Sequence, residues 1–360
     1  MRGTQMSIST RLNEFRKGTP PTQIHARKLA KLKNKVFSAY DKIDTKDAAR
    51  LGSFSRKLIA IEEKMGKKGV LFSFSWEKEA ITTADIFHRA QIEGCPVIFL
   101  ANSEISTNPR GAGDPNVTII PAHYSCIFNP CENSIKGERI AIFADLAESL
   151  LESNSIIMGG AIEGLGDAAH TIPAETLMPL LGRHYGGPSA KGVPPSLLAE
   201  AYSALSNFFS FGEKMSLEDV LVGYIAHELG HMAFTRRFPQ WTLDSPAQER
   251  FAFSYVLANS QSPHVDFANI IKMAVPSQDG SSLHKSASAE LVAGCNSRLF
   301  GEDARDSPIE ALIPKYFQAP ADRILSAAIE VFGAVCKSLG ASKEDFMGNP
   351  FEKVKKLVSG

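Results

Sequence analysis

The stretch His227-Glu-Leu-Gly-His231 contains the residues of this chain whose types and spacing best suit chemistry. In a helix, two histidines four positions apart lie on the same face, so both imidazoles can reach one ion. Glu228 is rotated by about 100° from His227, so its carboxylate can hold a water molecule beside that ion without binding the ion. The spacing therefore predicts a zinc site with His227 and His231 as ligands and Glu228 as the base that activates the water.

The surrounding sequence predicts the helix that this geometry needs. Ser216 and Asp219 form a capping-box pattern at its start, Arg236 and Arg237 suit the helix dipole at its end, and Pro239 stops it. Apolar residues recur at helical spacing through the first half: Leu217, Val220, Leu221, Tyr224 and Ile225. The alternative is a core helix whose two histidines are satisfied by neighbours. Burying two imidazoles and a carboxylate together without partners is costly, which favours the metal site.

Composition limits the classes of protein that this chain can be. With 360 residues, 44% of them hydrophobic, it can bury one large core or two ordinary ones. Its net charge of zero argues against a protein whose whole surface binds nucleic acid. Five scattered cysteines predict reduced thiols rather than disulfides or a zinc ribbon. No integral membrane segment is predicted, because no apolar run approaches the length that a transmembrane helix needs.

The N-terminal region is strongly basic. Residues 1–36 carry nine Lys or Arg and a single acidic residue, Glu14, without the apolar core of a secretory signal. Such a charge run is most simply a solvated helical face. The alternatives are binding of nucleic acid or an anionic surface by residues 1–36, or a delivery signal. We therefore expect a cytoplasmic protein, or one that is delivered or secreted without a classical signal peptide.

The order of the predicted elements indicates an α+β fold, with a mixed αβ first half containing a small sheet and a mainly helical second half carrying the HExxH helix. Residues 1–66 are predicted as a basic, helical N-terminal region whose first 20 or so residues are flexible. Residues 67–360 are predicted as the main domain, with an αβ part at 67–165 and a helical part at 194–360.

Hydrophobic periodicity and turn residues give the individual segments. Strands are predicted at 70–76, 96–102, 117–128, 139–145 and 155–164. Helices are predicted at 81–93, 146–152, 195–211, 247–260, 265–274, 286–300, 321–339 and 343–358, besides the HExxH helix. Residues 103–116 and 171–195 are predicted as loops.

A catalytic zinc takes a third protein ligand and leaves its fourth position to water. The metzincin continuation HExxHxxGxxH is absent, because Met232-Ala-Phe-Thr follows His231. Two later glutamates compete for the role. Glu249 lies 18 residues after His231, where a surface salt bridge with Arg250 is its structural alternative. Glu290 lies 59 residues after His231, among small residues that let helices approach closely.

HELGH followed by Ser286-x-x-x-Glu290-x-x-Ala293 resembles the gluzincin branch of the zincin (HExxH) metallopeptidase superfamily, nearest to soluble relatives of the HtpX and CAAX-protease type. The resemblance implies a zincin-like fold and one catalytic Zn²⁺, with His227, His231 and Glu290 as ligands and Glu228 as the base. Ala287 and Gly294 stand where the second motif of that family has Arg and Asp, and the membrane helices of the family are absent. On motif spacing we favour Glu290 as the third ligand, with Glu249 as the alternative.

These features predict a zinc-dependent endopeptidase that hydrolyses peptide bonds of a protein or peptide substrate. Besides zinc, the tetrahedral oxyanion needs a second electrophile, for which Tyr255, His264, His284 and Arg298 are the candidates. The rival prediction is a catalytically silent protein that keeps a zincin fold as a binding or structural module. Glu228 argues against this rival, because a purely structural zinc does not need it and closes the fourth position with protein.

Overall fold

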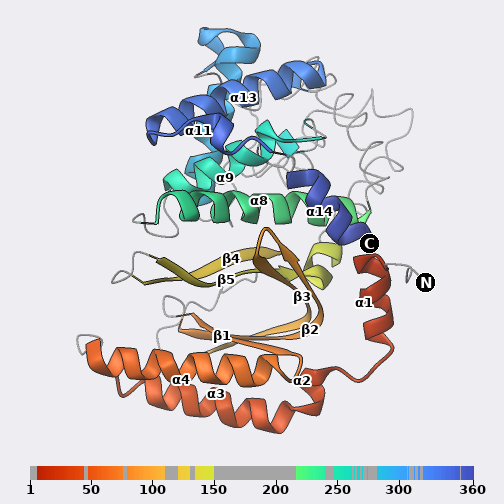
Figure 1. The fold of residues 1–360 in the computed structure, drawn as a ribbon, viewed down its shortest axis with the longest axis vertical. Coiled ribbons are helices and arrows are strands. Elements are labelled where there is room, and N and C mark those ends of the chain that lie inside the picture. Colours follow the sequence, from red (N-terminus) through yellow and green to blue (C-terminus); the bar gives the residue numbers. More distant parts are fainter. Residues whose placement is uncertain are drawn as a thin grey trace, which may run out of the picture. The chain divides into compact units, whose positions relative to one another are not determined.

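The computed structural model describes residues 6–43, 48–75, 79–109, 121–129, 134–149, 216–239, 246–261, 282–305, 319–348 and 350–360, with isolated positions between 263 and 316. The chain divides into two compact units. The first unit comprises Met1–Ser125, Glu138–Ser149 and Leu357–Gly360, and the second comprises Cys126–Gly137 and Leu150–Lys356. The described elements confirm the predicted α+β class, with strands in the first half and helices in the second (Figure 1).

Five strands form one sheet in the order β1-β2-β3-β5-β4. They are β1 (Val70–Ser75), β2 (Ala80–Ile92), β3 (Cys95–Thr107), β4 (Ala122–Asn129) and β5 (Ser134–Phe143). β2 pairs antiparallel with both β1 and β3, whereas β3 and β5 run parallel. The strands predicted within 70–76, 96–102, 117–128 and 139–145 are present where the structure describes them.

Two sequence predictions in this region were wrong. Residues 81–93 form strand β2 instead of a helix, and the segment predicted as a loop from 103 onward continues strand β3 as far as Thr107. The physical reason is a tight hairpin at Glu93-Gly94, where both residues have positive φ (50° and 82°). Such a two-residue turn matches the twist of antiparallel strands, and it pairs Ile92 directly with Cys95.

The N-terminal helices are α1 (Ile8–Arg16), α2 (Pro21–Ile24), α3 (Ala26–Tyr40) and α4 (Ala48–Gly66). Figure 1 shows α3 and α4 side by side across one face of β1 and β2. Their buried side chains share one hydrophobic cluster with these strands: Leu29, Val36, Phe37, Phe54, Leu58 and Met65 pack with Val70, Phe72, Phe74 and Ile81. The predicted boundary between the N-terminal region and the main domain, at residues 66–67, thus lies inside the first unit.

Residues 8–16, part of the start that was expected to be flexible, form α1, whose Ile8 and Leu12 are completely buried. A buried carboxylate ties the N-terminal helices to the sheet as well. Asp85 of β2 is fully buried and accepts hydrogen bonds from the backbone N–H of Thr22 (2.6 Å), from the Thr22 hydroxyl (2.8 Å) and from the Asn102 amide (2.9 Å). A buried carboxylate that accepts three donors has its desolvation offset, so this contact fixes α2 on the sheet.

The second unit is built from helices. They are α8 (Leu217–Arg237), α9 (Pro246–Ala258), α11 (Ser282–Phe300), α13 (Ala321–Ser338) and α14 (Pro350–Ser359), with short 3₁₀ turns η2 (Glu302–Ala304) and η3 (Lys343–Asp345). The prediction of one helix over 343–358 was wrong, because η3 and α14 are separate and Pro350 begins the second of them. The other helices predicted from 247 onward that the structure describes are present.

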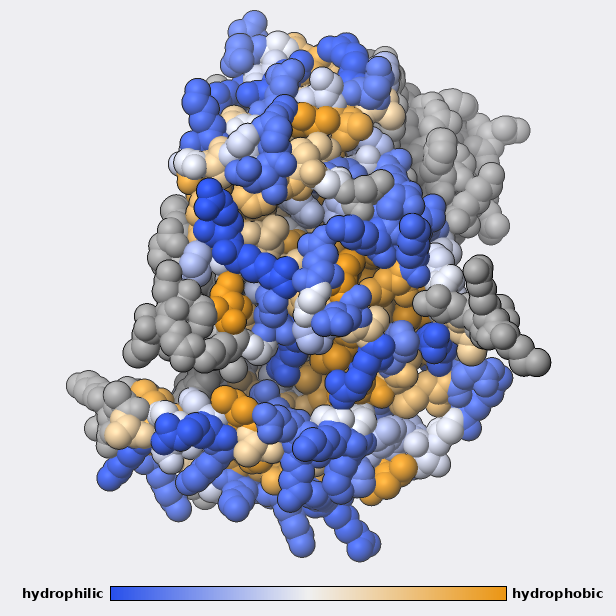
Figure 2. Space-filling view, viewed as in Figure 1, coloured by the Kyte–Doolittle hydropathy of each residue, from blue (hydrophilic) through white to orange (hydrophobic). Residues whose placement is uncertain are grey.

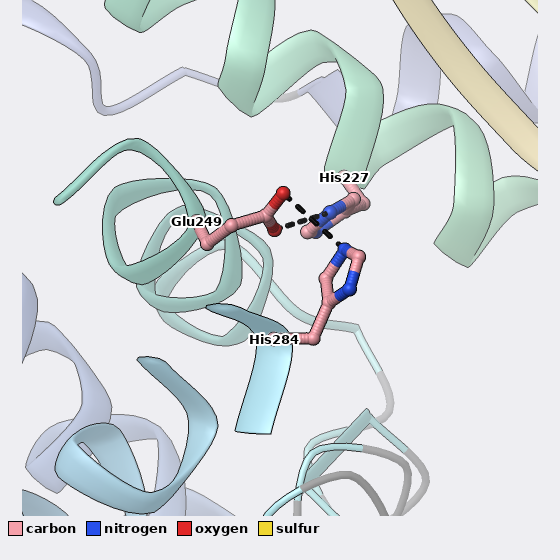
Figure 3. A group of neighbouring side chains, drawn as sticks. All are labelled: His227, Glu249 and His284. Carbon is pink, nitrogen blue, oxygen red and sulfur yellow. Dashed lines mark ion pairs between the residues drawn. The ribbon is translucent and has the colours of Figure 1, made fainter. Parts of the chain in front are cut away.

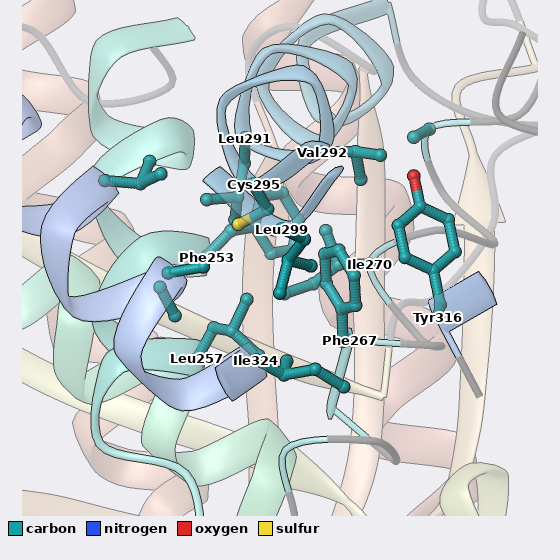
Figure 4. Close-up of a cluster of buried hydrophobic side chains, with 14 of the residues drawn as sticks. Phe253, Leu257, Phe267, Ile270, Leu291, Val292, Cys295, Leu299, Tyr316 and Ile324 are labelled. Carbon is teal, nitrogen blue, oxygen red and sulfur yellow. The ribbon is translucent and has the colours of Figure 1, made fainter. Parts of the chain in front are cut away.

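One hydrophobic cluster holds α9, α11 and α13 together (Figure 4). Phe253 and Leu257 come from α9, Leu291 and Cys295 from α11, and Ile324 from α13. Cys295 is a free thiol, as are the other described cysteines, Cys95, Cys126 and Cys336, in agreement with the sequence prediction. Burial raises the pKa of the Cys295 thiol to about 12, so this thiol is protonated and inert at neutral pH.

Three predicted segments lie outside the described residues, namely the strand at 155–164, the loop at 171–195 and the helix at 195–211. Most of the helix predicted at 265–274 lies outside them too. Within the described ranges no single helix has the length and hydropathy needed to cross a membrane. Taken together, the bent pair Ala321–Ser338 and Lys343–Ser359 has the length and composition of a membrane span, and only these two properties support that reading.

Candidate metal centre

Helix α8 presents the two histidines as the sequence predicts. Ser216 caps the helix, accepting a hydrogen bond from the backbone of Asp219, whose side chain in turn accepts one from the backbone N–H of Ser216. His227 and His231 lie one turn apart on the helix, and their Nε2 atoms are 3.0 Å from each other. Glu228, between them in sequence, is buried on the same helix.

Helix α9 supplies a carboxylate to this pair. Glu249 is only 5% exposed, and its Oε2 atom lies 3.5 Å from the Nε2 atoms of both His227 and His231. α9 is buried over nearly its whole length, from Gln248 to Ala258, so its polar residues must find partners inside the protein. Gln248 finds one in Thr235 of α8, to whose hydroxyl its side-chain amide donates at 3.0 Å.

The third contributor is His284, near the start of α11. Its Nε2 atom lies 3.2 Å from Oε1 of Glu249, the other oxygen of this carboxylate. Figure 3 shows His227 and His284 directed at the same carboxylate from two different helices. Phe253, one turn after Glu249 on α9, packs against both rings, with centroid distances of 4.5 Å to His227 and 6.0 Å to His284.

The close approach of α8 and α9 depends on Gly230, inside the HELGH motif. A Cβ atom at this position would lie 2.8 Å from Cα of Ala252 and 3.2 Å from its Cβ, closer than such carbon atoms pack. The backbone of α9 therefore passes directly over a glycine of α8. This contact brings Glu249, three residues before Ala252, within reach of the two histidines.

The residues present fit a metal ion. A tetrahedral ion with ligands at about 2.0–2.1 Å separates its ligand atoms by about 3.3–3.4 Å. The three distances among Nε2 of His227, Nε2 of His231 and Oε2 of Glu249 are 3.0, 3.5 and 3.5 Å, so these atoms can form one face of such a tetrahedron. Oε2 of Glu249 is buried and accepts no hydrogen bond from the part of the chain that the structure describes. A cation bound by these three atoms would satisfy it.

A second combination shares two of these residues. Ligand atoms of His227, Glu249 and His284 lie within 4.8 Å of one another, so this group too can hold a metal ion. We take His227, His231 and Glu249 as the ligand set, because their separations match a tetrahedral face more closely. His284 then holds the other carboxylate oxygen, the position that an orienting residue occupies around a metal ligand.

The histidines keep the Glu249 carboxyl ionised. Burial alone raises its pKa, but the contacts with His227, His231 and His284 outweigh burial and lower the pKa below the ordinary value. A buried anion with three imidazoles around it suits a cation at the same place. Nδ1 of His227 is also buried, and it has no hydrogen-bond partner among the described residues.

Glu290, which motif spacing favours as the third ligand, is placed elsewhere by the structure. Its carboxylate is half-exposed and pairs with the guanidinium of Arg250 at 2.5 Å. The reason is helix geometry: Glu290 lies six positions after His284 on α11, so the two side chains point about 120° apart around the helix. Arg250, considered above as a partner for Glu249, binds Glu290 instead. The geometry therefore supports the alternative that the sequence left open, Glu249.

The other predicted oxyanion residues lie apart from the cluster where they are described. Tyr255 is buried in the aromatic core, stacked on Phe251 with a centroid distance of 6.2 Å and close to Phe332. Arg298 pairs with Glu330 at 3.3 Å and donates to the carbonyl of Gly294. His264 lies outside the described residues. Of the four candidates, only His284 is shown at the site.

Comparison of the chain with protein-family models, with curated proteins and with solved structures gives no match in any of the three.

The Gly230 contact predicts opposite outcomes for two glycines of the same helix. Gly230→Ala overpacks the α8–α9 contact and destabilises the protein by about 1–3 kcal/mol. The new Cβ of Gly223→Ala would meet, among the described residues, only Asp266, at 3.7 Å. The better helix propensity of alanine therefore makes this substitution neutral or stabilising by up to about 1 kcal/mol. Urea unfolding followed by circular dichroism measures both. Equal effects of the two substitutions would contradict the packing constraint.

Proposed function

We propose that this protein is a zinc-dependent peptidase of the zincin type, with His227, His231 and Glu249 as the zinc ligands and Glu228 as the general base. The observation that carries the proposal is the convergence of two α8 histidines and a buried α9 carboxylate on one point. Glu228 directly follows the ligand His227 in the sequence. Two imidazoles and one carboxylate are a ligand set typical of catalytic zinc, which keeps a further position for water.

The chemistry is divided between the metal and the chain. Zinc, when bound, supplies a Lewis acid that lowers the pKa of water toward 7 and polarises the scissile carbonyl. Glu228 takes the proton of the attacking water and delivers it to the leaving amine nitrogen, and its rotation of about 100° from His227 keeps it off the metal. The apolar wall that Phe253 forms beside His227 reduces the access of bulk water, which strengthens the electrostatic interactions at the centre.

His284 has a positioning role in this proposal. Because it holds Oε1 of Glu249 at 3.2 Å, it leaves Oε2 directed at the histidines of α8. Groups that orient a metal ligand in this way stabilise the assembled site without binding the metal.

One observation favours a second candidate function. His227, Glu249 and His284 also form a possible metal-binding group, and His231 lies beside them. Four protein ligands would close a tetrahedral metal site, as in structural zinc proteins, and the protein would then be a metal-stabilised binding module. Glu228 has no evident role in that arrangement, which is why the peptidase is preferred.

The ligand assignment is tested by zinc content. Wild type is expected to retain about one zinc per chain after dialysis, and Glu249→Gln to lose it because the amide oxygen carries no charge. The matched control is Glu290→Gln, which removes only a surface pair worth about 0–1 kcal/mol and should keep its zinc. Elemental analysis of the three proteins gives the answer. Loss of zinc in Glu290→Gln alone would return the ligand role to Glu290.

Peptidase activity is tested with Glu228→Gln. Zinc-loaded wild type is expected to cleave peptides of a proteome-derived library, detected by mass spectrometry. Glu228→Gln should retain its zinc but cleave about 10²–10⁴-fold more slowly, since it lacks the general base. Glu290→Gln again serves as the control and should cleave like wild type. A zinc-loaded wild type that leaves the whole library intact, or a Glu228→Gln variant with full activity, would end the peptidase proposal.

The role of His284 is tested with His284→Ala. We expect zinc affinity to fall about 10–100-fold, because Glu249 loses the group that orients it, while saturating zinc still gives one ion per chain. Zinc titration with a competing chelator measures the affinity, and the rate of peptide hydrolysis is measured at saturating zinc. The two measurements together distinguish an orienting His284 from a His284 that binds the zinc. Faster hydrolysis by the variant would identify His284 as a fourth ligand that closes the site. Unchanged affinity would remove its positioning role.

A further inference from the structure

Positive charge is concentrated in one part of this neutral chain. The whole sequence has 39 Lys or Arg and 39 Asp or Glu. Residues 26–68, which contain α3 and α4, have 13 Lys or Arg against five Asp or Glu. The rest of the chain is therefore acidic by the same margin, and the positive charge belongs to the two helices that cover the sheet of the first unit.

Helix α3 separates this charge from its buried side. It contains five Lys or Arg and no acidic residue, and its Leu29, Val36 and Phe37 face the hydrophobic cluster on the sheet. Arg27, Lys31 and Lys35 recur at every fourth position and are exposed, so they form a line along the solvent side of α3. Figure 2 shows hydrophilic side chains projecting all along α3 and α4.

The end of α4 and the turn after it add to this line. Lys64, Lys67 and Lys68 are exposed there. Partial desolvation, and after it the nearby ammonium groups of Lys68 and Lys64, lower the pKa of Lys28. Crowded like charges repel one another, and a bound anion would relieve this repulsion. Within the described part of the chain, Arg27, Lys31, Lys35 and Lys64 form no ion pair, whereas Lys33 pairs with Glu104 at 3.0 Å.

Two exposed isoleucines accompany the basic residues. Ile24, which ends α2 just before α3, is 63% exposed, and Ile59 of α4 is 38% exposed. The other large hydrophobic residues exposed in the described chain are methionines, so none of them is an aromatic ring on which a nucleic-acid base could stack. α3 also carries four lysines and one arginine, although arginine is the residue best suited to bidentate recognition of phosphate. Lysines with isolated aliphatic residues suit the surface of an anionic bilayer.

We propose that the solvent side of α3 and α4, defined by Arg27, Lys28, Lys31, Lys35, Lys64 and Lys68 and here called the basic face, binds the anionic lipid headgroups of a membrane surface. Lysines near a negatively charged leaflet attract it additively, and Ile24, which lies close to Arg27 and Lys28 in the chain, can enter the headgroup region. Binding is peripheral and depends on ionic strength, because attraction between exposed charges extends only about 10 Å at 0.1 M salt. The proposal does not depend on the metal centre, which lies in the other unit.

The test uses the full chain and sedimentation with vesicles. Wild type should bind vesicles of phosphatidylcholine and phosphatidylserine, and should not bind vesicles of phosphatidylcholine alone. A variant with Arg27→Gln, Lys31→Gln and Lys35→Gln should bind the anionic vesicles about 100-fold more weakly, which corresponds to about 1 kcal/mol for each charge removed. Circular dichroism and an unchanged melting temperature show that the variant is folded.

A matched variant neutralises three exposed lysines of the second half of the chain, Lys337→Gln, Lys355→Gln and Lys356→Gln. It changes the net charge by the same amount and should bind like wild type. If this control variant lost as much binding to anionic vesicles, the effect would come from overall charge, and the proposal would be overturned. Equal binding of the wild type to neutral and anionic vesicles would overturn it as well.

Nucleic acid is the competing anionic partner and is tested in the same assay. A random-sequence DNA duplex and a random-sequence RNA are added to the protein and its anionic vesicles. The lipid proposal expects most of the protein to stay with the vesicles at equal concentrations of phosphate. Transfer of the protein to either nucleic acid would overturn the proposal and assign the basic face to nucleic-acid binding.

Discussion

The contact between Gly230 of α8 and Ala252 of α9 is the constraint on which the candidate site depends. No side chain fits between the two backbones at this point. Around it the helices hold each other through the bond from Gln248 to Thr235 and through the rings of Phe234 and Phe251, whose centroids lie 5.4 Å apart. Because the helices are this close, the side chain of Glu249 is long enough to reach the Nε2 atoms of His227 and His231 on the neighbouring helix. The glycine of HELGH thus matters as much to the geometry of the site as the histidines on either side of it.

Helix α8 could be predicted from the sequence because its signals are local. Its cap, its periodicity and the four-residue spacing of its histidines all lie within one stretch of chain, and the structure has each of them. The proposed third ligand could not be identified in this way, since it depends on which side of a later helix faces α8. Glu249 and Glu290 both lie on helices at acceptable separations from His231. Glu249 faces the histidines, and its neighbour Arg250 points far enough around α9 to bind Glu290. Adjacent residues of a helix point about 100° apart, so Glu249 and Arg250 face different neighbours. No pattern in the sequence shows which side of α9 faces α8.

The errors in the first half have a similar origin. Residues 81–93 contain apolar and polar residues in an order compatible with a helix, but both edges of this segment are hydrogen-bonded to strands, β1 on one side and β3 on the other. Pairing on both sides outweighs a weak local preference. Helices α3 and α4 lie in the stretch that was predicted as helical, whereas α1 lies in the stretch that was expected to be flexible, and the place of these helices on the sheet was missed. Helices α3 and α4 attach through the hydrophobic cluster that they share with β1 and β2. Helix α2 attaches through Asp85, which accepts two hydrogen bonds from Thr22, far from it in sequence, and one from Asn102. The charge pattern of α3 could be counted from the sequence, whereas its position on the solvent side required the structure.

The protonation of the cluster gives the strongest physical reason to expect a metal there. Two Nε2 atoms 3.0 Å apart can share only one proton in a hydrogen bond, so one imidazole donates and the other accepts. Neither then makes a good hydrogen bond to Oε2 of Glu249, since 3.5 Å is longer than the usual range. The carboxylate is buried and ionised, and no described residue donates a hydrogen bond to this oxygen. A single cation at the centre changes all three relationships, because both imidazoles can then be neutral acceptors toward the metal and the carboxylate gains an opposite charge. The arrangement is poorly satisfied by protons and well satisfied by a metal ion.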